Sequence, residues 1–266
     1  MLPDFELFGK TIGTYGLCSI IGIVLCVCVA TYAGKRYRLS FDDILLLTLS
    51  ICGGLLLGGH LLYALTQQEQ LRTVVQAIGK APFQAILRTL ASCFGGMVFY
   101  GGFLGGIAGA WLFGKYYRPV TSAIALDLYA LVIPLFHAFG RIGCFLGGCC
   151  YGKPWQSGVQ FPYNPLVPQL SEVPRFPVQL VEAGCNLVIF AVLLLLWSRR
   201  KTQEKLLFVY MLIYPPVRFT LEFFRGDSVR GFLWGLSTSQ WISIILFCIA
   251  LLYYMLRNIR RKQRTS

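Results

Sequence analysis

The stretch 137–153 holds the densest group of reactive side chains in the chain. His137 and Arg141 stand four residues apart, and glycines and three cysteines follow: Cys144, Cys149 and Cys150. Glycines let a backbone approach a ligand closely and present its N–H donors. A guanidinium offers a planar fork of donors that matches phosphate. The stretch therefore favours an anion site over a plain tight turn whose arginine extends to a membrane surface.

The three clustered cysteines admit more than one chemistry. Together with His137 they suggest zinc, but the Cys-x4-Cys-Cys spacing differs from the paired Cys-x2–4-Cys typical of structural zinc. We therefore expect no metal. A disulfide from Cys144 to Cys149 or Cys150 is favoured on the oxidising outer face of a membrane. His137 is equally consistent with a hydrogen-bonded structural group and with a base.

A second polar set lies in the stretch 214–227. Tyr214, Arg218 and Glu222 are spaced four residues apart, so they share one helix face. Charges in an apolar span are costly unless they are paired or face a polar cavity. An Arg218–Glu222 ion pair that only packs two helices is the simpler interpretation. The favoured one keeps the pair and turns the guanidinium towards a lipid phosphate.

Two further stretches carry weaker signals. In 99–106, Gly102 and Gly106 form a small-xxx-small pattern that predicts a helix contact. In 175–182, Pro177 suits the first turn of a helix, and Glu182 one turn later needs a partner.

Composition places all these residues in a membrane protein. Hydrophobic residues make up 56% of the 266 residues and charged ones 13%, against about 25% charged in soluble domains. This excludes a water-soluble enzyme and a disordered chain. We predict an all-α polytopic fold with about seven transmembrane helices, at 12–33, 44–65, 92–113, 122–139, 178–197, 206–224 and 239–256.

The positive charge indicates how the chain is oriented. The net charge of +13 comes from Lys and Arg at the ends of apolar runs, so we expect anionic headgroups as partners and no nucleic acid. Most of these bases fall inside if the N-terminus is outside and the C-terminus inside. The chain 1–266 then forms one integral membrane domain with outer segments at about 66–91 and 140–177. The first is predicted to hold an interfacial helix, with an apolar face of Leu71, Val74, Val75 and Ile78.

Six motifs in order resemble the bacterial prolipoprotein diacylglyceryl transferases over nearly the whole chain. They begin at Tyr15 (Tyr-Gly-Leu), after Tyr100 (Gly-Gly-Phe-Leu-Gly), at Gly140 (Gly-Arg-Ile-Gly), at Pro177 (Pro-Val-Gln-Leu-Val-Glu), at Tyr214 (through Arg218 to Glu222-Phe-Phe-Arg-Gly-Asp) and at Gly235 (Gly-Leu-Ser-Thr-Ser-Gln). The resemblance implies transfer of the diacylglyceryl group of phosphatidylglycerol to the lipobox cysteine thiol of a prolipoprotein. It implies a multi-pass protein of the bacterial inner membrane, with its active site facing outward and no cofactor.

The resemblance also implies roles for single residues. Arg141 and Arg218 would hold the phosphate and stabilise charge on the leaving group. Tyr15 and Tyr214 would line the headgroup pocket, while Glu222 orients Arg218. The expected catalytic residues are Arg141, Arg218, His137 and Tyr100. The expected substrate-binding residues are Tyr15, Gly101, Gly102, Gly143, Cys144, Cys149, Gly152, Gln179, Tyr214 and Glu222.

Three positions depart from the family pattern. Tyr100 replaces the usual His, Cys144 replaces an Asn and Cys149 replaces a Glu. The base is therefore expected from His137, or Cys149 or Cys150 acts as a transient lipid carrier. Two alternatives stay open. One is the same fold and phospholipid donor with a non-lipoprotein acceptor. The other is a non-catalytic lipid-binding or transport protein, or a thiol redox partner.

Overall fold

The computed structural model describes residues 4–7, 10–117, 119–163, 168–199, 205–226 and 232–263. Long helices dominate these residues, with a few short strands. The chain forms two compact units. The first combines Met1–Ala33 with Ala130–Ser266, and the second is Gly34–Tyr129. The single membrane domain stays a prediction.

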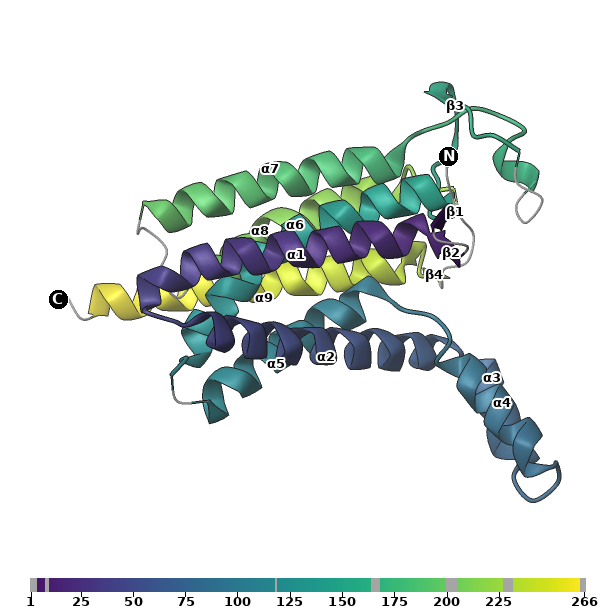
Figure 1. Cartoon of the computed structure of the whole chain (residues 1–266), viewed down its shortest axis with the longest axis horizontal. Helices are drawn as coiled ribbons and strands as arrows, with labels where there is room; N and C mark the ends of the chain where they lie inside the picture. Colours follow the sequence, from purple (N-terminus) through teal and green to yellow (C-terminus); the bar gives the residue numbers. More distant parts are fainter. Residues whose placement is uncertain are drawn as a thin grey trace. The chain divides into compact units, whose positions relative to one another are not determined.

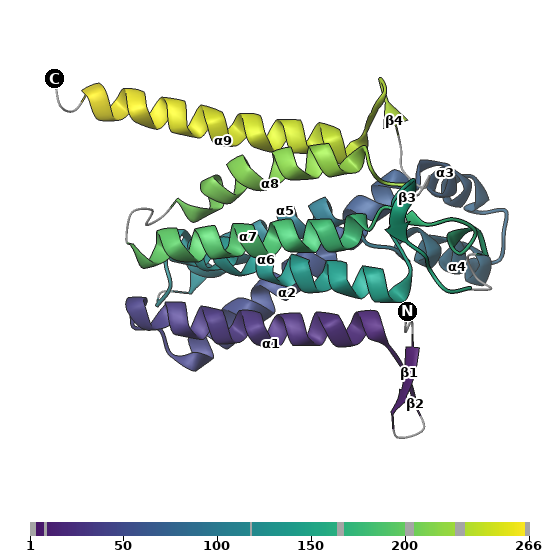
Figure 2. The ribbon, with the colours of Figure 1, turned by 90° about the horizontal axis from the view of Figure 1, so that it is seen from above.

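Five helices run alongside one another in the first unit (Figures 1 and 2): α1 (Thr14–Gly34), α6 (Ser122–Gly147, which begins in the second unit), α7 (Val178–Ser198), α8 (Leu206–Glu222) and α9 (Thr238–Gln263). A hairpin of β1 (Asp4–Leu7) and β2 (Lys10–Gly13) precedes α1, and a hairpin of β4 (Phe232–Leu233) and β5 (Leu236–Ser237) leads into α9. Helix α8 packs against both α7 and α9.

Helix α6 is longer than the sequence predicts. The expected span ended at residue 139, before a glycine-rich turn, whereas α6 continues to Gly147 despite Pro134 in its middle. A Cβ on Gly140 or Gly147 would meet no atom within 4 Å, so neither glycine is required here by a close contact. Lipid and protein surroundings favour closing every backbone hydrogen bond. The predicted end of this span at residue 139 is therefore wrong: Arg141 and Cys144 lie on the last two turns of a helix.

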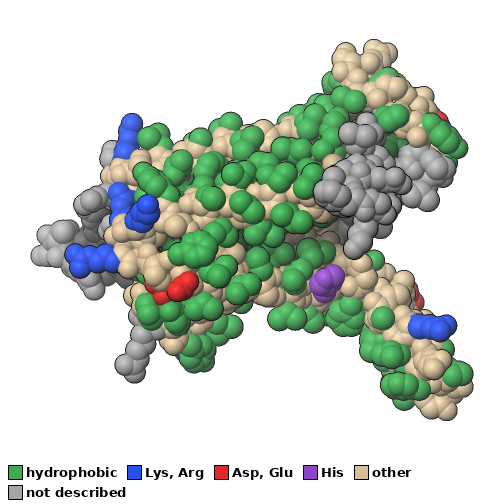
Figure 3. Space-filling view, viewed as in Figure 1, with side chains coloured by type: hydrophobic (Ala, Val, Ile, Leu, Met, Phe, Trp, Pro, Cys, Tyr) green, Lys and Arg blue, Asp and Glu red, His purple; other side chains and the backbone are tan. Residues whose placement is uncertain are grey.

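Five helices in the described part of the chain are long and apolar enough to cross a membrane: Thr14–Tyr37, Phe41–Thr66, Ser122–Gly147, Val178–Ser198 and Thr238–Arg257. The other two expected spans are also helices, but shorter, with 18 residues in α5 and 17 in α8. In the first unit, hydrophobic side chains cover much of the visible helical surface (Figure 3). Ile20, Val24 and Val188 of this unit are each more than half exposed. Such a surface fits lipid rather than water.

The second unit contains α2 (Phe41–Thr66), α3 (Gln68–Ala77), α4 (Phe83–Cys93) and α5 (Phe99–Tyr116), together with the first residues of α6. A capping box starts α2, because the Ser40 side chain accepts from the Asp43 amide at 3.1 Å and the Asp43 carboxylate accepts from the Ser40 amide at 2.7 Å. Helices α2 and α5 then pack closely side by side.

Glycines allow the close approach of α2 and α5. A Cβ on Gly54 or Gly58 of α2 would collide with the backbone of α5, and one on Gly105 with the backbone of α2. The predicted pair behaves differently. Gly102 contacts the side chain of Leu55 on α2, and Gly106 contacts Tyr129 of α6. The backbone-to-backbone contact is thus made one residue earlier than the sequence pattern predicts.

The predicted interfacial helix is two helices, α3 and α4, packed against each other. Gly79 adopts a left-handed conformation (φ +76°) just after α3, and Pro82 precedes α4, so the chain reverses between them. Large apolar side chains on this pair are exposed, including Val75, Ile78 and Phe83. Of the apolar face expected from the sequence, Val75 and Ile78 are exposed, Leu71 is half-buried and Val74 is buried, so only part of that face is uncovered in this unit.

Candidate functional site

Glu182 is the centre of a buried ionic cluster in the first unit. Its Oε2 lies 2.7 Å from Nη2 of Arg141 and 3.3 Å from Nη1 of Arg218. Its Oε1 accepts a hydrogen bond from the Tyr214 hydroxyl at 3.1 Å and lies 3.5 Å from Nε2 of His137. All five side chains are buried. Helices α6, α7 and α8 therefore meet at one carboxylate.

Arg218 binds a second carboxylate on its own helix. Its Nη2 lies 2.6 Å from Oε2 of Glu222, four residues further along α8, and 3.4 Å from Oγ of Ser239. The ion pair predicted from the spacing is present. Arg218 is thus fixed from three sides, which gives a guanidinium a defined orientation for its remaining donors.

Helical periodicity explains why these residues converge. His137 and Arg141 are four residues apart on α6, as are Tyr214 and Arg218 on α8, so each pair faces one side of its helix. Pro177 stands at the N-cap of α7, which places Glu182 just over one turn inside. The cluster lies near the ends of α6 and α8 and near the start of α7.

The charges in the cluster nearly cancel. Two guanidiniums face two carboxylates, as burial requires, and Arg225 adds a further positive field at both Glu182 and His137. In the part of the chain that the structure describes, the buried Nε of Arg141 has no hydrogen-bond partner. A donor and a positive field are thus available to an anionic group.

Aromatic rings border the ionic cluster. The Tyr214 ring meets the edge of His137 with centroids 5.3 Å apart, and Tyr210 stacks on Tyr214 at 5.3 Å and 7°. Tyr15 is half exposed on α1. A Cβ on Gly143 would lie 3.1 Å from the Tyr15 ring, so Gly143 acts in the packing of α1 on α6.

Two other predicted site residues position the loop after α6. Gln179 is fully buried and donates from Nε2 to the carbonyl of Cys149 at 2.9 Å. Gly152 pairs with Arg225 in a short bridge, and a Cβ there would collide with the carbonyl of Phe176. The loop continues through β3 (Pro154–Val159) and a short turn at Pro168–Leu170. Arg175 covers the Tyr151 ring, with Cζ 4.7 Å from the centroid.

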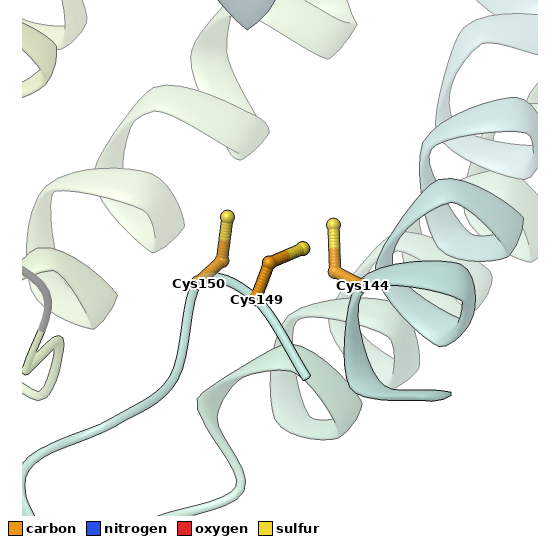
Figure 4. Close-up of side chains that lie close together, drawn as sticks. All are labelled: Cys144, Cys149 and Cys150. Carbon is orange, nitrogen blue, oxygen red and sulfur yellow. The ribbon is translucent and has the colours of Figure 1, made fainter. Parts of the chain in front are cut away.

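The three cysteines also come together, at the end of α6. The sulfur atoms of Cys144, Cys149 and Cys150 all lie within 4.8 Å of one another as free thiols (Figure 4). Gly148 (φ +75°) and Cys150 (φ +57°) have left-handed backbones that fold the chain back towards Cys144.

Hydrogen bonds among the three cysteines shift their thiol pKa values in opposite directions. They lower the pKa of Cys150, to which Cys144 and then Cys149 contribute most, with a smaller contribution from the positive charge of Arg141. The hydrogen bond with Cys144 raises the pKa of Cys149.

Tyr100, Gly101 and Gly102 belong to the second unit, in the first turn of α5. All three are buried there, and the Tyr100 ring packs 5.5 Å from the Phe99 ring. Gly101 serves the contact with α2, since a Cβ would collide with the carbonyl of Gly58.

Sequence reasoning missed the central role of Glu182, which it noted only as needing a partner. It also missed Asn186, which is fully buried and donates from Nδ2 to the Glu182 carbonyl at 2.8 Å. A signal was available, because Gln179, Glu182 and Asn186 are spaced three and four residues apart in an apolar helix. Such a polar stripe indicates a helix face turned towards a polar interior.

Apolar helices around a buried arginine–glutamate cluster define an integral membrane protein with a buried polar site. The chain belongs to the prolipoprotein diacylglyceryl transferase family, whose model matches residues 4–256. This confirms the resemblance seen in the six motifs.

Named relatives match almost end to end. The phosphatidylglycerol–prolipoprotein diacylglyceryl transferase of Clostridium tetani is 34% identical, over 97% of this chain and 98% of its own. The second such enzyme of Clostridium perfringens is 33% identical over 98% and 97%. That of Campylobacter jejuni strain 81-176 is 31% identical over 94% and 91%.

Proposed function

We propose that this protein transfers the diacylglyceryl group of phosphatidylglycerol to the thiol of a prolipoprotein cysteine. The observation that carries the proposal is the pair of buried arginines, Arg141 and Arg218, held by one carboxylate within a chain of this family. Two oriented guanidiniums suit the phosphodiester of a phospholipid headgroup. The names of the relatives supply the donor and the acceptor.

The proposed step forms one bond and breaks another. The acceptor sulfur uses its electron pair to form a C–S bond with the glyceryl carbon. The bond between that carbon and the phosphate oxygen breaks, and glycerol phosphate leaves with the electron pair. Arg141 and Arg218 offset the charge that gathers on the leaving phosphate. Glu182 keeps both guanidiniums in position throughout.

The acceptor thiol must lose its proton, because the thiolate is the nucleophile. We assign this proton to His137, which lies 3.5 Å from Glu182 inside the cluster. The chain's other histidine, His60, is in the second unit, with Nδ1 2.8 Å from the carbonyl of Gly96. Tyr15, Tyr214 and Gln179 border the proposed headgroup position. For Tyr100, Gly101 and Gly102, the support is the family motif alone.

We further propose seven membrane crossings, with the N-terminus outside and the C-terminus inside the bacterial inner membrane. In the first unit, basic residues flank the end of α7, the start of α8 and the end of α9: Arg199, Lys205 and Arg257. These helix ends lie on the same side of the unit, opposite β1, β2 and β3 (Figures 1 and 2). Positive ends face the cytoplasm, so the cluster faces outward. The exposed apolar face of α3 and α4 would rest on the outer membrane surface.

The proposal is tested with the purified protein in phosphatidylglycerol vesicles and a lipobox peptide. Mass spectrometry should detect a thioether-linked diacylglyceryl peptide and released glycerol phosphate. Arg141→Ala and Arg218→Ala should abolish both products, while Arg88→Ala on the exposed surface of α4 should not. Full turnover in the two site variants would contradict the phosphate-binding role.

A second acceptor class is favoured by one observation. Thiols gather at Cys144, Cys149 and Cys150, where the family pattern has other residue types at two of the three positions. The same assay separates the two proposals. Arginine-dependent consumption of phosphatidylglycerol without peptide modification would replace the lipobox thiol by a different acceptor on the same donor site.

A further inference from the structure

The three thiols at the end of α6 form a compact donor set. Cys144 is buried, Cys150 is half-buried and Cys149 is exposed, and their sulfur atoms lie within 4.8 Å of one another. In the close-up, the three side chains point into the same space (Figure 4). The set is thus anchored at the buried Cys144 and accessible to a ligand at the exposed Cys149.

The backbone explains how an unusual spacing yields a convergent set. The amide of Cys149 donates to the carbonyl of Cys144 at 3.1 Å, which closes the end of the helix. The left-handed conformations of Gly148 and Cys150 then turn the chain so that the thiols of Cys149 and Cys150 lie close to that of Cys144. A fixed carbonyl of Cys149, bound by Gln179 at 2.9 Å, holds the turn in place. The Cys-x4-Cys-Cys spacing therefore does not argue against a shared ligand.

A disulfide would use only part of this arrangement. It joins two sulfurs and leaves the third without a role, and adjacent cysteines such as Cys149 and Cys150 rarely bridge each other. A soft metal cation uses all three, because thiolates are preferred ligands of zinc and copper(I). Arg141, one turn before Cys144, interacts electrostatically with Cys144 and Cys150, and Arg225 with Cys150. Their positive charge offsets the excess negative charge of three thiolates around a divalent ion.

We propose that Cys144, Cys149 and Cys150 bind one Zn²⁺ ion through three thiolates and leave its fourth position open. Three protein ligands with one open position is the pattern of catalytic zinc sites, whereas structural sites are closed by four. This site replaces the expectation of no metal that the spacing alone suggested.

The open position suits the acceptor thiol, an inference that rests on the proposed function. A thiol that binds zinc loses its proton and remains a thiolate; His137 or water takes the proton. With zinc bound there, the acceptor sulfur would form the C–S bond while the C–O bond to the glycerol phosphate breaks and the electron pair leaves with the phosphate oxygen. The zinc site would thereby activate the acceptor thiol in a chain that has Tyr100 where the family usually has a His.

Metal binding is measured first, without reference to activity. The full-length protein in detergent is reduced, freed of metal and titrated with Zn²⁺ or Co²⁺ alone. We expect one ion per chain and, with Co²⁺, the absorption of sulfur-to-metal charge transfer. Cys144→Ser, Cys149→Ser and Cys150→Ser should each weaken binding at least about tenfold. Cys248→Ser, at an exposed position on α9, should not.

Three results would overturn the zinc site. One is the absence of stoichiometric binding with all three thiols open to alkylation. Another is a disulfide between Cys144 and either neighbour in the protein as isolated under non-reducing conditions. The third is a diacylglyceryl adduct on Cys149 or Cys150 as a reaction intermediate, since a thioether cannot serve as a thiolate ligand.

The role of the metal is tested separately from the proposed function. With zinc bound, transfer to the lipobox peptide should stop on chelation and return with added Zn²⁺. Transfer that survives complete removal of the metal would overturn the activating role while leaving the proposed function intact. Zinc binding in a protein that never modifies the peptide would instead contradict the proposed acceptor.

Discussion

Burial of charge is the dominant fact at the scale of single residues. Glu182 is 1% exposed and compensates two guanidiniums, one from α6 and one from α8. Breaking a buried ion pair by removing one partner leaves an uncompensated charge, which costs far more than losing a surface pair. Glu182 therefore acts both in stability and in positioning Arg141 and Arg218.

Glu182→Gln tests this directly, because the side chain keeps its shape and loses its charge. We expect a free energy of unfolding lower by about 3–5 kcal/mol and loss of transfer. Thermal unfolding in detergent measures the first effect. Glu69→Gln is the matched control, since its ion pair with Arg72 is exposed and such pairs contribute about 0–1 kcal/mol. Equal unfolding temperatures for Glu182→Gln and the wild type would refute the central position of Glu182.

Arg218→Lys separates charge from geometry. Lysine keeps the positive charge but cannot bridge Glu182 and Glu222 while presenting a planar donor pair to phosphate. We expect kcat/KM for phosphatidylglycerol to fall about 100-fold or more, with the folded protein retained on size-exclusion chromatography. A variant with wild-type kcat/KM would mean that charge alone suffices at this position.

Sequence patterns predicted part of this site. Arg218 and Glu222 were paired by helical spacing, and Arg141 was selected by its glycine-rich neighbours. The shared carboxylate was not predicted, because Glu182 is distant in sequence from both arginines and only the packing of three helices brings them together. The three cysteines are close in sequence, but their sulfur atoms come together only because Gly148 and Cys150 adopt left-handed backbone conformations.

At the scale of helices, the second unit is organised by α2 and α5, which pack against each other through their glycines. A Cβ on Gly54 would collide with the carbonyl of Gly105, and one on Gly58 with the carbonyl of Gly101. Helices α2 and α5 thus approach to backbone contact, which provides van der Waals contact where lipid offers no hydrophobic drive.

Gly54→Ala should separate α2 from α5. We expect a loss of about 1–3 kcal/mol in stability, the range for overpacked interiors. Gly53→Ala is the matched control in the same helix, because a Cβ there meets no atom within 4 Å. Unfolding of the two variants in detergent compares them. If both unfold like the wild type, or both are equally destabilised, the proposed glycine contact is wrong.

Element boundaries show where sequence patterns stop being sufficient. Six of the seven predicted spans lie mainly within one helix each, since apolar runs of this length have few other folds available. The predicted span 92–113 was misplaced, because α4 ends at Cys93 and α5 begins only at Phe99. The end of α6 was misplaced because glycine signals a turn in water yet is compatible with a packed helix. The break between α3 and α4 was missed although Gly79 and Pro82 mark it.

At the scale of the whole molecule, five candidate membrane spans and apolar helix surfaces identify a multi-pass membrane protein. Basic residues at the ends of α7, α8 and α9 lie on one side of the first unit, and the arginine–glutamate cluster lies near the other. This asymmetry gives the proposed orientation a physical cause, since lysine and arginine resist export across the membrane.

The proposed orientation predicts different activities for reporters placed at the C-terminus and between α3 and α4. An alkaline phosphatase fused after residue 263 should be inactive because it stays in the cytoplasm, while one inserted between α3 and α4 at residue 80 should be active. Fusions that give the opposite pair of activities would invert the orientation and place the site on the cytoplasmic side.

The most direct test of the whole account is lipid transfer by the reconstituted protein. Phosphatidylglycerol vesicles and a lipobox peptide are incubated with the wild type, Arg141→Ala and Arg218→Ala, and the peptide and glycerol phosphate are measured by mass spectrometry. The account predicts a thioether-linked diacylglyceryl peptide with an equal amount of glycerol phosphate for the wild type only. Equal product from all three proteins, or consumption of phosphatidylglycerol without any modified peptide, would contradict it.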